Sequence, residues 1–264
     1  MTSMRSGRNW ISSSNLLLRR AWAAMGLPFD VKMIDERIEG ILDVEAILVA
    51  TFLTMGRDRS ATDVPAWIIR FSDLINHQKL KGLWANLPPK HRKRVLTTLA
   101  LFPEMPKTFR NIFALSTSGS KTTIRLIETR MNKLDSLEHI APRSIMIKNR
   151  LLYGTGFRAD LISLLQVENL KVNARQMSKL LCAADSTISR LLSDLRAGQL
   201  LDQNNEMKNR EETFPCLFLS SYTILNLLNM IDALEFQSEE LKRSAVETLD
   251  LRFDGFTRVL LSTT

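Results

Sequence analysis

The chain has 264 residues, of which 45% are hydrophobic and 24% are charged, and its formal net charge is +8. This composition is typical of globular proteins, so it excludes a disordered or fibrous chain, and the length allows one large domain or two modest ones. The longest apolar stretch, Ala46 to Gly56, is shorter than the roughly 20 residues that a bilayer requires, so we expect no membrane span. Two distant cysteines, Cys182 and Cys216, form neither a CxxC pair nor a disulfide framework, which fits a reducing cytoplasm.

The N-terminal 29 residues are basic and rich in serine. They contain Arg5, Arg8, Arg19 and Arg20, and no acidic residue precedes Asp30. Organellar transit peptides have this composition. We favour the alternative of a basic N-terminal arm that includes a short helix over residues 15–25.

Apolar residues then recur at helical spacing. One stripe runs from Ile34 to Leu42, and a more buried helix is predicted from Val44 to Thr54. Asp63 is a candidate N-cap, and Pro65 would fall in the first turn, where it costs no helical hydrogen bond. This pattern predicts a helix from about Val64 to His77.

Further helical patterns follow the Pro88-Pro89 pair. One helix is predicted from His91 to Leu101, residues 108–117 fit either a helix or a loop, and a helix from Thr122 to Leu137 has an apolar stripe. The stripe contains Ile124, Ile127, Met131, Leu134 and Leu137. Because period-two alternation is almost absent before residue 140, we predict an α-helical domain over residues 1–142, with its boundary near Pro142.

Residues 143–220 form the next predicted domain, and within it the stretch from Phe157 to Leu219 has the pattern helix, helix, turn, helix, strand, loop, strand. A first helix begins near Phe157 and is predicted to end at Asn169, and Asn173 can cap a second helix. After the turn at Cys182-Ala183-Ala184, a third helix is predicted from Asp185 to Ala197, with Gly198 as its left-handed C-terminal cap.

A small β-hairpin is predicted after the third helix. Leu200–Asp202 and Cys216–Leu219 can pair as strands, and the polar loop Gln203–Pro215 between them presents Lys208 and Arg210. Cations in such a loop suit contact with a phosphate backbone.

The second and third helices supply the predicted DNA-binding residues. The inward positions of the third helix are Ile188, Leu191, Leu192 and Leu195, which leaves small hydroxyl side chains and one guanidinium facing outward. Such side chains can approach a major groove and bond to phosphates or base edges. The candidates are Ser186, Thr187, Ser189, Arg190 and Ser193 on the third helix and Arg175 on the second.

Residues 173–201, with Ser186-Thr-Ile-Ser-Arg190 followed by a leucine pattern, resemble the winged helix-turn-helix of bacterial regulators of the MarR and ArsR type. The resemblance covers about a quarter of the chain and implies that the third helix is the recognition helix. This sequence departs from the pattern at Cys182, where a glycine is usual, and at Ala184, where a serine is usual. The preceding segment, Lys148 to Ile162, is similar to bacterial helix-turn-helix proteins without an assigned biochemical role.

Charge is unevenly distributed along the chain. Lys90–Lys133 has ten basic and two acidic residues, and Arg143–Arg210 has eleven basic and six acidic residues. These blocks predict an anionic polymer as partner. Within the first block, Arg92, Lys93 and Arg94 are candidate phosphate contacts, although a solvated helix end is an equally good interpretation of that cluster. Residues 221–264 are acidic, and an apolar stripe in them suits homodimerisation through helices; it contains Ile224, Leu227, Leu228 and Ile231.

These patterns predict a mainly α fold with a winged helix-turn-helix and a sequence-specific regulator of transcription that binds double-stranded DNA in the cytoplasm, associated with the nucleoid. The alternative is a protein-interaction component, such as the antitoxin-like part of a toxin–antitoxin or phage-defence system, with a partner from the same operon. We expect no enzyme and no cofactor. Ser118–Thr123 lacks the glycine spacing of a phosphate-binding loop, and the three histidines have no spacing that suits a metal site.

Overall fold

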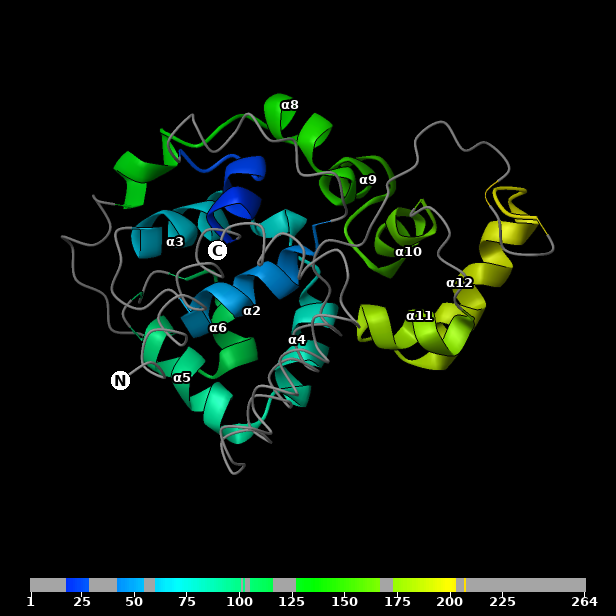
Figure 1. Ribbon diagram of the computed structural model, residues 1–264, viewed down its shortest axis with the longest axis horizontal. Helices are drawn as coiled ribbons and strands as arrows, with labels where there is room; N and C mark the ends of the chain where they lie inside the picture. Colours follow the sequence, from blue (N-terminus) through cyan, green and yellow to red (C-terminus); the bar gives the residue numbers. More distant parts are fainter. Residues whose placement is uncertain are drawn as a thin grey trace, which may run out of the picture.

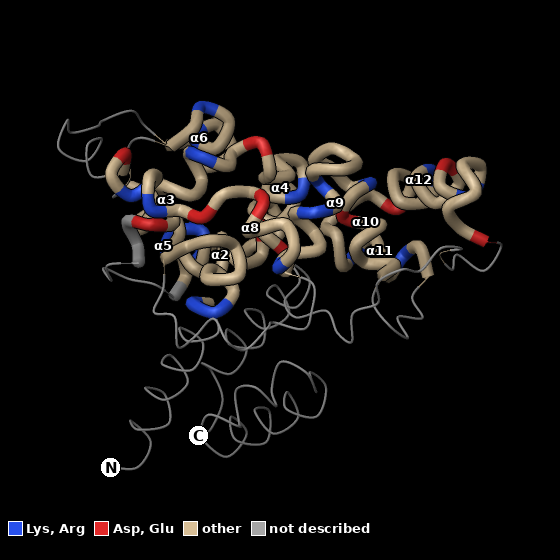
Figure 2. Tube along the Cα trace, turned by 90° about the horizontal axis from the view of Figure 1, so that it is seen from above, with Lys and Arg blue, Asp and Glu red and all other residues tan. Residues whose placement is uncertain are grey.

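The computed structural model describes residues 18–28, 42–54, 60–100, 102, 105–115, 127–166, 173–202 and 207. These residues are mainly helical and include no β-strand. Their helices form an elongated arrangement with two parts (Figures 1 and 2). We call the larger part, up to residue 147, the helical body, and helices α10 to α12 the three-helix unit. Within the described residues, no helix is both long and apolar enough to cross a membrane.

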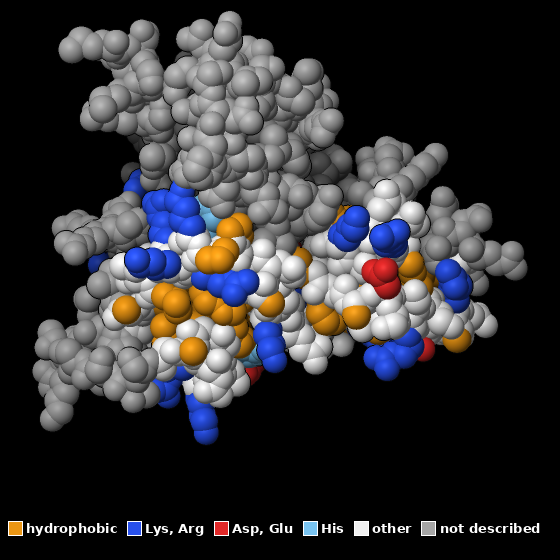
Figure 3. All heavy atoms as spheres, turned by 90° about the horizontal axis from the view of Figure 1, so that it is seen from below, with side chains coloured by type: hydrophobic (Ala, Val, Ile, Leu, Met, Phe, Trp, Pro, Cys, Tyr) orange, Lys and Arg blue, Asp and Glu red, His pale blue; other side chains and the backbone are white. Residues whose placement is uncertain are grey.

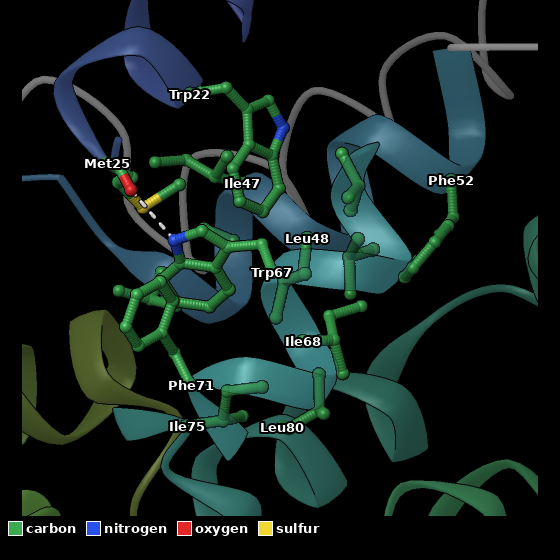
Figure 4. Packing of buried hydrophobic residues seen from close by; sticks show 14 of the residues in the cluster. Trp22, Met25, Ile47, Leu48, Phe52, Trp67, Ile68, Phe71, Ile75 and Leu80 are labelled. Atoms are coloured by element: carbon green, nitrogen blue, oxygen red, sulfur yellow. Dashed lines mark hydrogen bonds between the residues drawn. The ribbon is translucent and has the colours of Figure 1, made fainter. Parts of the chain in front are cut away.

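The core of the helical body is a cluster of buried hydrophobic residues in which aromatic rings pack among aliphatic side chains (Figure 4). The rings of Trp22 and Trp67 are both buried and meet edge to face, with centroids 5.4 Å apart. Each indole N–H has an acceptor: Trp67 Nε1 donates to the Met25 carbonyl at 2.8 Å, and Trp22 Nε1 donates to Thr51 Oγ1 at 2.7 Å. Burying these rings therefore leaves no indole N–H unsatisfied.

Of the first two helices predicted in the body, one has the predicted bounds and the other does not. Helix α2 spans Val44–Thr54, as predicted. The predicted helix over residues 64–77 is wrong: α3 spans Ser60–Arg70, a 3-10 turn covers Ser72–Leu74, and α4 spans His77–Asn86. The new start at residue 77 has a local cause, because Asn76 Oδ1 caps α4 by accepting the Lys79 backbone N–H at 3.1 Å.

The rest of the body consists of short helices. Helix α5 spans Pro89–Leu99, beginning and ending two residues before the predicted bounds, and α6 spans Lys107–Phe113. The single helix predicted to end at Leu137 is wrong, because helical residues 127–131 are followed by a turn, then by α8 at Leu137–Ile140 and a 3-10 turn at Ala141–Arg143. Ile127 and Leu134 are nevertheless both buried, so these two residues of the predicted stripe pack in the core although one continuous helix does not join them.

Helix α9, Ile145–Tyr153, connects the two parts and lies beside α10, Phe157–Leu165. Its first residues pack in the core of the body, whereas the core of the three-helix unit begins at Leu161. Helix α10 ends at Leu165, before the predicted end at Asn169, which lies outside the described residues. Helix α11 spans Ala174–Leu181 and α12 spans Asp185–Ala197, the latter with the predicted bounds.

The C-terminal cap of α12 differs from the prediction by one residue. Gly198 has φ −75°, and Gln199 takes the left-handed conformation with φ 59°. Backbone bonds from Gln199 N to the Arg196 carbonyl (2.9 Å) and from Leu200 N to the Leu195 carbonyl (3.0 Å) complete a Schellman motif. The motif satisfies two of the last carbonyls of the helix.

Of the predicted hairpin, the described residues contain one antiparallel bridge, between Leu201 and Met207. Met207 belongs to the predicted loop, so this bridge is not the predicted pairing of Leu200–Asp202 with Cys216–Leu219. The second predicted strand, Cys216–Leu219, and residues 221–264 lie outside the described residues, as does most of the N-terminal arm, of which residues 18–24 are helical.

Candidate nucleic-acid interface

The start of α11 is a complete capping box. Asn173 Oδ1 accepts the Gln176 backbone N–H, and Gln176 Oε1 accepts the Asn173 backbone N–H, both at 2.9 Å. Two backbone donors that a helix start leaves unpaired are thereby satisfied by side chains. The cap that the sequence predicted at Asn173 is confirmed.

The turn between α11 and α12 has the left-handed geometry that usually calls for glycine. Cys182 has φ 50° and ψ 40°, and its backbone N–H donates to the Lys179 carbonyl at 3.2 Å. A residue with a Cβ occupies this conformation at a cost of about 1–2 kcal/mol. Asp185 reinforces the turn, because its carboxylate accepts a hydrogen bond from the Ser178 hydroxyl on α11. Asp185 therefore joins the two helices, while Ala184 is the N-cap residue.

Helix α12 has the buried and exposed faces that the sequence predicted. Its four inward residues are buried, and Leu161 and Ile162 of α10 belong to the same core. Ser186, Ser189, Arg190 and Ser193 are exposed, whereas Thr187 is half-buried on the flank of the helix. The exposed face is thus centred on Ser186, Arg190 and Ser193, which recur at intervals of three and four.

Helix α11 adds a short basic stripe. Arg175 and Lys179 are both exposed and are four residues apart, so they lie on the same face of the helix. The predicted DNA-binding residues include Arg175 but not Lys179, although the spacing of four between the two is visible in the sequence. The predicted loop cations Lys208 and Arg210 lie outside the described residues.

The basic cluster at residues 92–94 is on α5, at the end of the helical body away from α12 (Figures 1 and 2). Arg92 is half-buried, and its guanidinium donates to the carbonyls of Leu87 (2.7 Å) and Ala85 (2.6 Å) at the end of α4. This arginine therefore caps α4. Lys93 and Arg94 are exposed. Because α5 and α12 lie at opposite ends of the described helices (Figures 1 and 2), the structure does not bring the cluster together with the exposed face of α12.

Exposed cations are more widely spread than these candidates. On the face of the molecule seen in Figure 3, Lys and Arg side chains occur on both parts, and few acidic side chains lie among them. On the three-helix unit, Asp194 of α12 faces Arg158 of α10 at 3.7 Å, with both side chains about half exposed. Such an exposed pair contributes little to stability.

A second constellation, which sequence reasoning missed, lies at the joint between the helical body and α10. We call it the ion cluster; it consists of Asp43, Glu45, Lys79, Arg150 and Asp160, all of them buried. Arg150 Nη1 and Nη2 donate to the two oxygens of Glu45 at 2.9 and 2.8 Å, and its Nε donates to Asp160 Oδ1 at 2.8 Å. Its Nη1 also donates to the Leu74 carbonyl at 2.6 Å.

Lys79 is the second cation of the ion cluster. Its Nζ forms an ion pair with Asp43 Oδ2 at 2.9 Å and lies 3.7 Å from Glu45 Oε2 and 3.6 Å from Asp160 Oδ2. Asn76 donates its backbone N–H to Glu45 (2.7 Å) and its side-chain amide to Asp160 (3.0 Å). Glu45 and Asp160 therefore each contact both cations.

The ion cluster holds three carboxylates against two cations. The surplus negative charge is offset by helix N-termini, whose partial positive charge favours anions. Asp43 Oδ1 accepts the Ala46 N–H at the start of α2 (3.1 Å), Glu45 is in the first turn of α2, and Asp160 is in the first turn of α10.

Burial and pairing shift the ionisation of these groups in different directions. Burial raises the pKa of Glu45, against the attraction of Arg150 and Lys79. Burial also acts to raise the pKa of Asp160, but the charges of Arg150 and Lys79 outweigh it, so that pKa is lowered. Burial alone would lower the pKa of Lys79 and of Arg150, yet the surrounding carboxylates raise both, so these cations stay protonated at neutral pH.

The sequence carries a partial signal for the ion cluster. Glu45 and Asp160 each lie between apolar residues at a buried position of a helix, and Arg150 is buried on α9 just before the apolar residues at its end. A charge at such a position requires a partner of opposite sign, but the sequence does not say which. Among the described residues, no group of acidic, histidine or cysteine side chains is arranged to hold a metal ion.

Comparisons with known proteins add no relative: no family model, curated protein or solved structure matches the chain.

Proposed function

We propose that this protein is a transcriptional regulator that binds double-stranded DNA, with α12 as the recognition helix. The observation that carries the proposal is the pair of faces on α12. One face is buried in the core of the three-helix unit, and the other presents Ser186, Arg190 and Ser193 to solvent. Side chains of this size and chemistry suit close approach to a major groove.

Helix α11 supports the same proposal. The first helix of a helix-turn-helix crosses the DNA backbone, and α11 carries Arg175 and Lys179 on one exposed stripe. Such cations position the protein on the duplex without reading its sequence. We extend this role to Lys208 and Arg210 of the predicted polar loop, which lie outside the described residues.

Replacing Arg190 by Ala tests the proposal. We expect a loss of about 1–3 kcal/mol in specific binding, because a guanidinium can bond to two acceptors of one base. The duplex is first selected from random sequence by binding to the full chain, and affinity is then measured by fluorescence anisotropy. Arg143→Ala is the matched control, since it removes an exposed arginine of the helical body that pairs with Asp135 at 2.8 Å. Equal affinities for both variants would contradict the assignment of α12.

Salt dependence separates DNA binding from protein contact. Affinity for DNA should fall steeply with salt concentration, because each neutralised phosphate releases counterions. Neutralising Arg175 and Lys179 together should reduce the slope of log affinity against log salt by about one unit for each lost contact. An unchanged slope would remove α11 from the interface.

A protein-interaction module, such as an antitoxin-like component, is the second candidate function. The observation that favours it is an exposed apolar corner at the end of α9, formed by Leu151, Leu152 and Tyr153. Exposed apolar side chains that adjoin one another can mark protein contact sites. The test is whether the full chain captures a protein encoded in the same operon and whether Leu152→Ser abolishes that capture. If it does, and no duplex is selected, this function replaces the first.

A homodimer belongs to the first proposal. Two copies related by a twofold axis would present their α12 helices to successive major grooves, about 34 Å apart. The selected duplex should then contain two half-sites in inverted orientation, and a single half-site would contradict the dimer.

A further inference from the structure

Helix α4 contacts the three-helix unit at two places. Near its start, Asn76 and Lys79 bind Asp160 of α10 within the ion cluster. One turn later, Gly82 lies against the turn between α11 and α12: a Cβ at this position would be 2.8 Å from the Cys182 carbonyl oxygen. Lys79 and Gly82 are three residues apart, so they lie on the same side of α4.

The two contacts differ in their physical nature, and they involve different parts of the three-helix unit. The first is a set of buried, directional hydrogen bonds and ion pairs to α10. The second is a close approach of backbone to backbone, which only the absence of a side chain permits. With a single contact, the three-helix unit could rotate about that point on the helical body. Two separated contacts on the same helix oppose such a rotation.

The ion cluster also strengthens the first contact from the side of α9. Arg150 bonds to Asp160 of α10 and at the same time to Glu45 of α2 and to the Leu74 carbonyl of the body. Movement of α10 away from the body would leave these buried charges without partners, which carries a large cost. We propose that the ion cluster and the Gly82 contact form a two-point latch that fixes the orientation of the three-helix unit on the helical body.

The latch predicts one narrow distribution of distances between the two parts. Spin labels attached to an encoded azide-bearing residue at Asn111 of α6 and at Ala197 of α12 would report it, since both positions are exposed. This labelling leaves Cys182 unchanged. The distances between the two labels are then measured by pulsed electron–electron double resonance on the full chain without DNA. The result therefore does not depend on the proposed function.

Two variants open the latch at different points. Asp160→Asn removes a charge that both cations contact, and Gly82→Ala places a Cβ against the Cys182 carbonyl. Each should broaden the distance distribution at least about twofold, while hydrogen exchange within α11 and α12 remains slow. Arg143→Ala, which removes only the exposed pair with Asp135, is the control and should leave the distribution narrow.

If Asp160→Asn does not fold, a combined variant replaces it and removes the buried charges together, so that none is left unpaired. It carries Asp43→Asn, Glu45→Leu, Lys79→Met, Arg150→Met and Asp160→Leu. A broad distribution in this variant supports the latch. A broad distribution in the unmodified chain, or narrow distributions in Gly82→Ala and in the folded ion-cluster variant, would overturn it.

Discussion

At the residue scale, Gly82 shows how a tertiary contact reverses an ordinary helix preference. Replacing a glycine inside a helix by alanine normally stabilises it by about 0.5–1 kcal/mol. At position 82 the added Cβ would lie 2.8 Å from the Cys182 carbonyl oxygen, so we expect Gly82→Ala to lower the free energy of unfolding. Urea unfolding measures the change. A gain in stability would show that the contact is not close in solution. Ala85→Gly, at an exposed position of the same helix, is the control and should show only the usual cost of glycine.

Leu192 tests the assignment of the buried face of α12. Its side chain is 2% exposed in the core of the three-helix unit, so Leu192→Ala should cost about 2–5 kcal/mol, because it removes buried contacts and leaves a cavity. The control is Leu152→Ala, since Leu152 is 66% exposed and surface substitutions usually change stability by less than about 0.5 kcal/mol. Similar unfolding midpoints for the two variants would mean that the faces of α12 are wrongly assigned.

At the element scale, α11 has only eight residues, so its ends matter for its stability. Asn173→Ala removes the side-chain acceptor for the Gln176 N–H and should destabilise the three-helix unit by about 1 kcal/mol. Asn173→Ser, which keeps an oxygen at the N-cap, should recover most of that loss. Hydrogen exchange of the α11 amides reports the effect locally. Equal exchange in the Ala and Ser variants would mean that the capping box does not stabilise the helix.

At the scale of the whole molecule, the ion cluster links stability to pH through two groups of opposite sign. Asp160 has a lowered pKa, so its contribution is present above its ordinary value of 3.8 and is lost as pH falls through the folded value. The stability difference between the unmodified chain and Asp160→Asn should therefore shrink below pH 3.8. Urea unfolding at a series of pH values measures this difference, and a constant difference across that range would contradict the lowered pKa.

Glu45 should behave in the opposite way in the same experiment. Burial raises its pKa above 4.5, so the folded state holds the proton more tightly than the unfolded state. Its contribution to the free energy of unfolding should fall as pH rises from 4.5 through the pKa of the folded state. Glu45→Gln should remove this dependence of stability on pH.

Short-range patterns in the sequence determined several elements of this protein. The bounds of α2 and α12, the cap at Asn173 and the buried face of α12 were predicted, because each depends on residues within a few positions of one another. The exposed residues of the candidate interface follow from the same periodicity. The prediction is wrong where one helix ends and another begins: the region predicted as one helix contains the later part of α3, a 3-10 turn and the first residue of α4.

Only the tertiary structure decided how these elements are joined. Arg150 and Glu45 are 105 positions apart along the chain and Asn76 and Asp160 are 84 apart, yet they share one buried cluster. No periodicity connects such residues, since their pairing depends on three helix starts meeting at one place. Gly82 shows the same limit. Its sequence suggests only a weak point in α4, whereas the structure shows that the missing side chain makes room for the Cys182 carbonyl, because two backbones approach closely there.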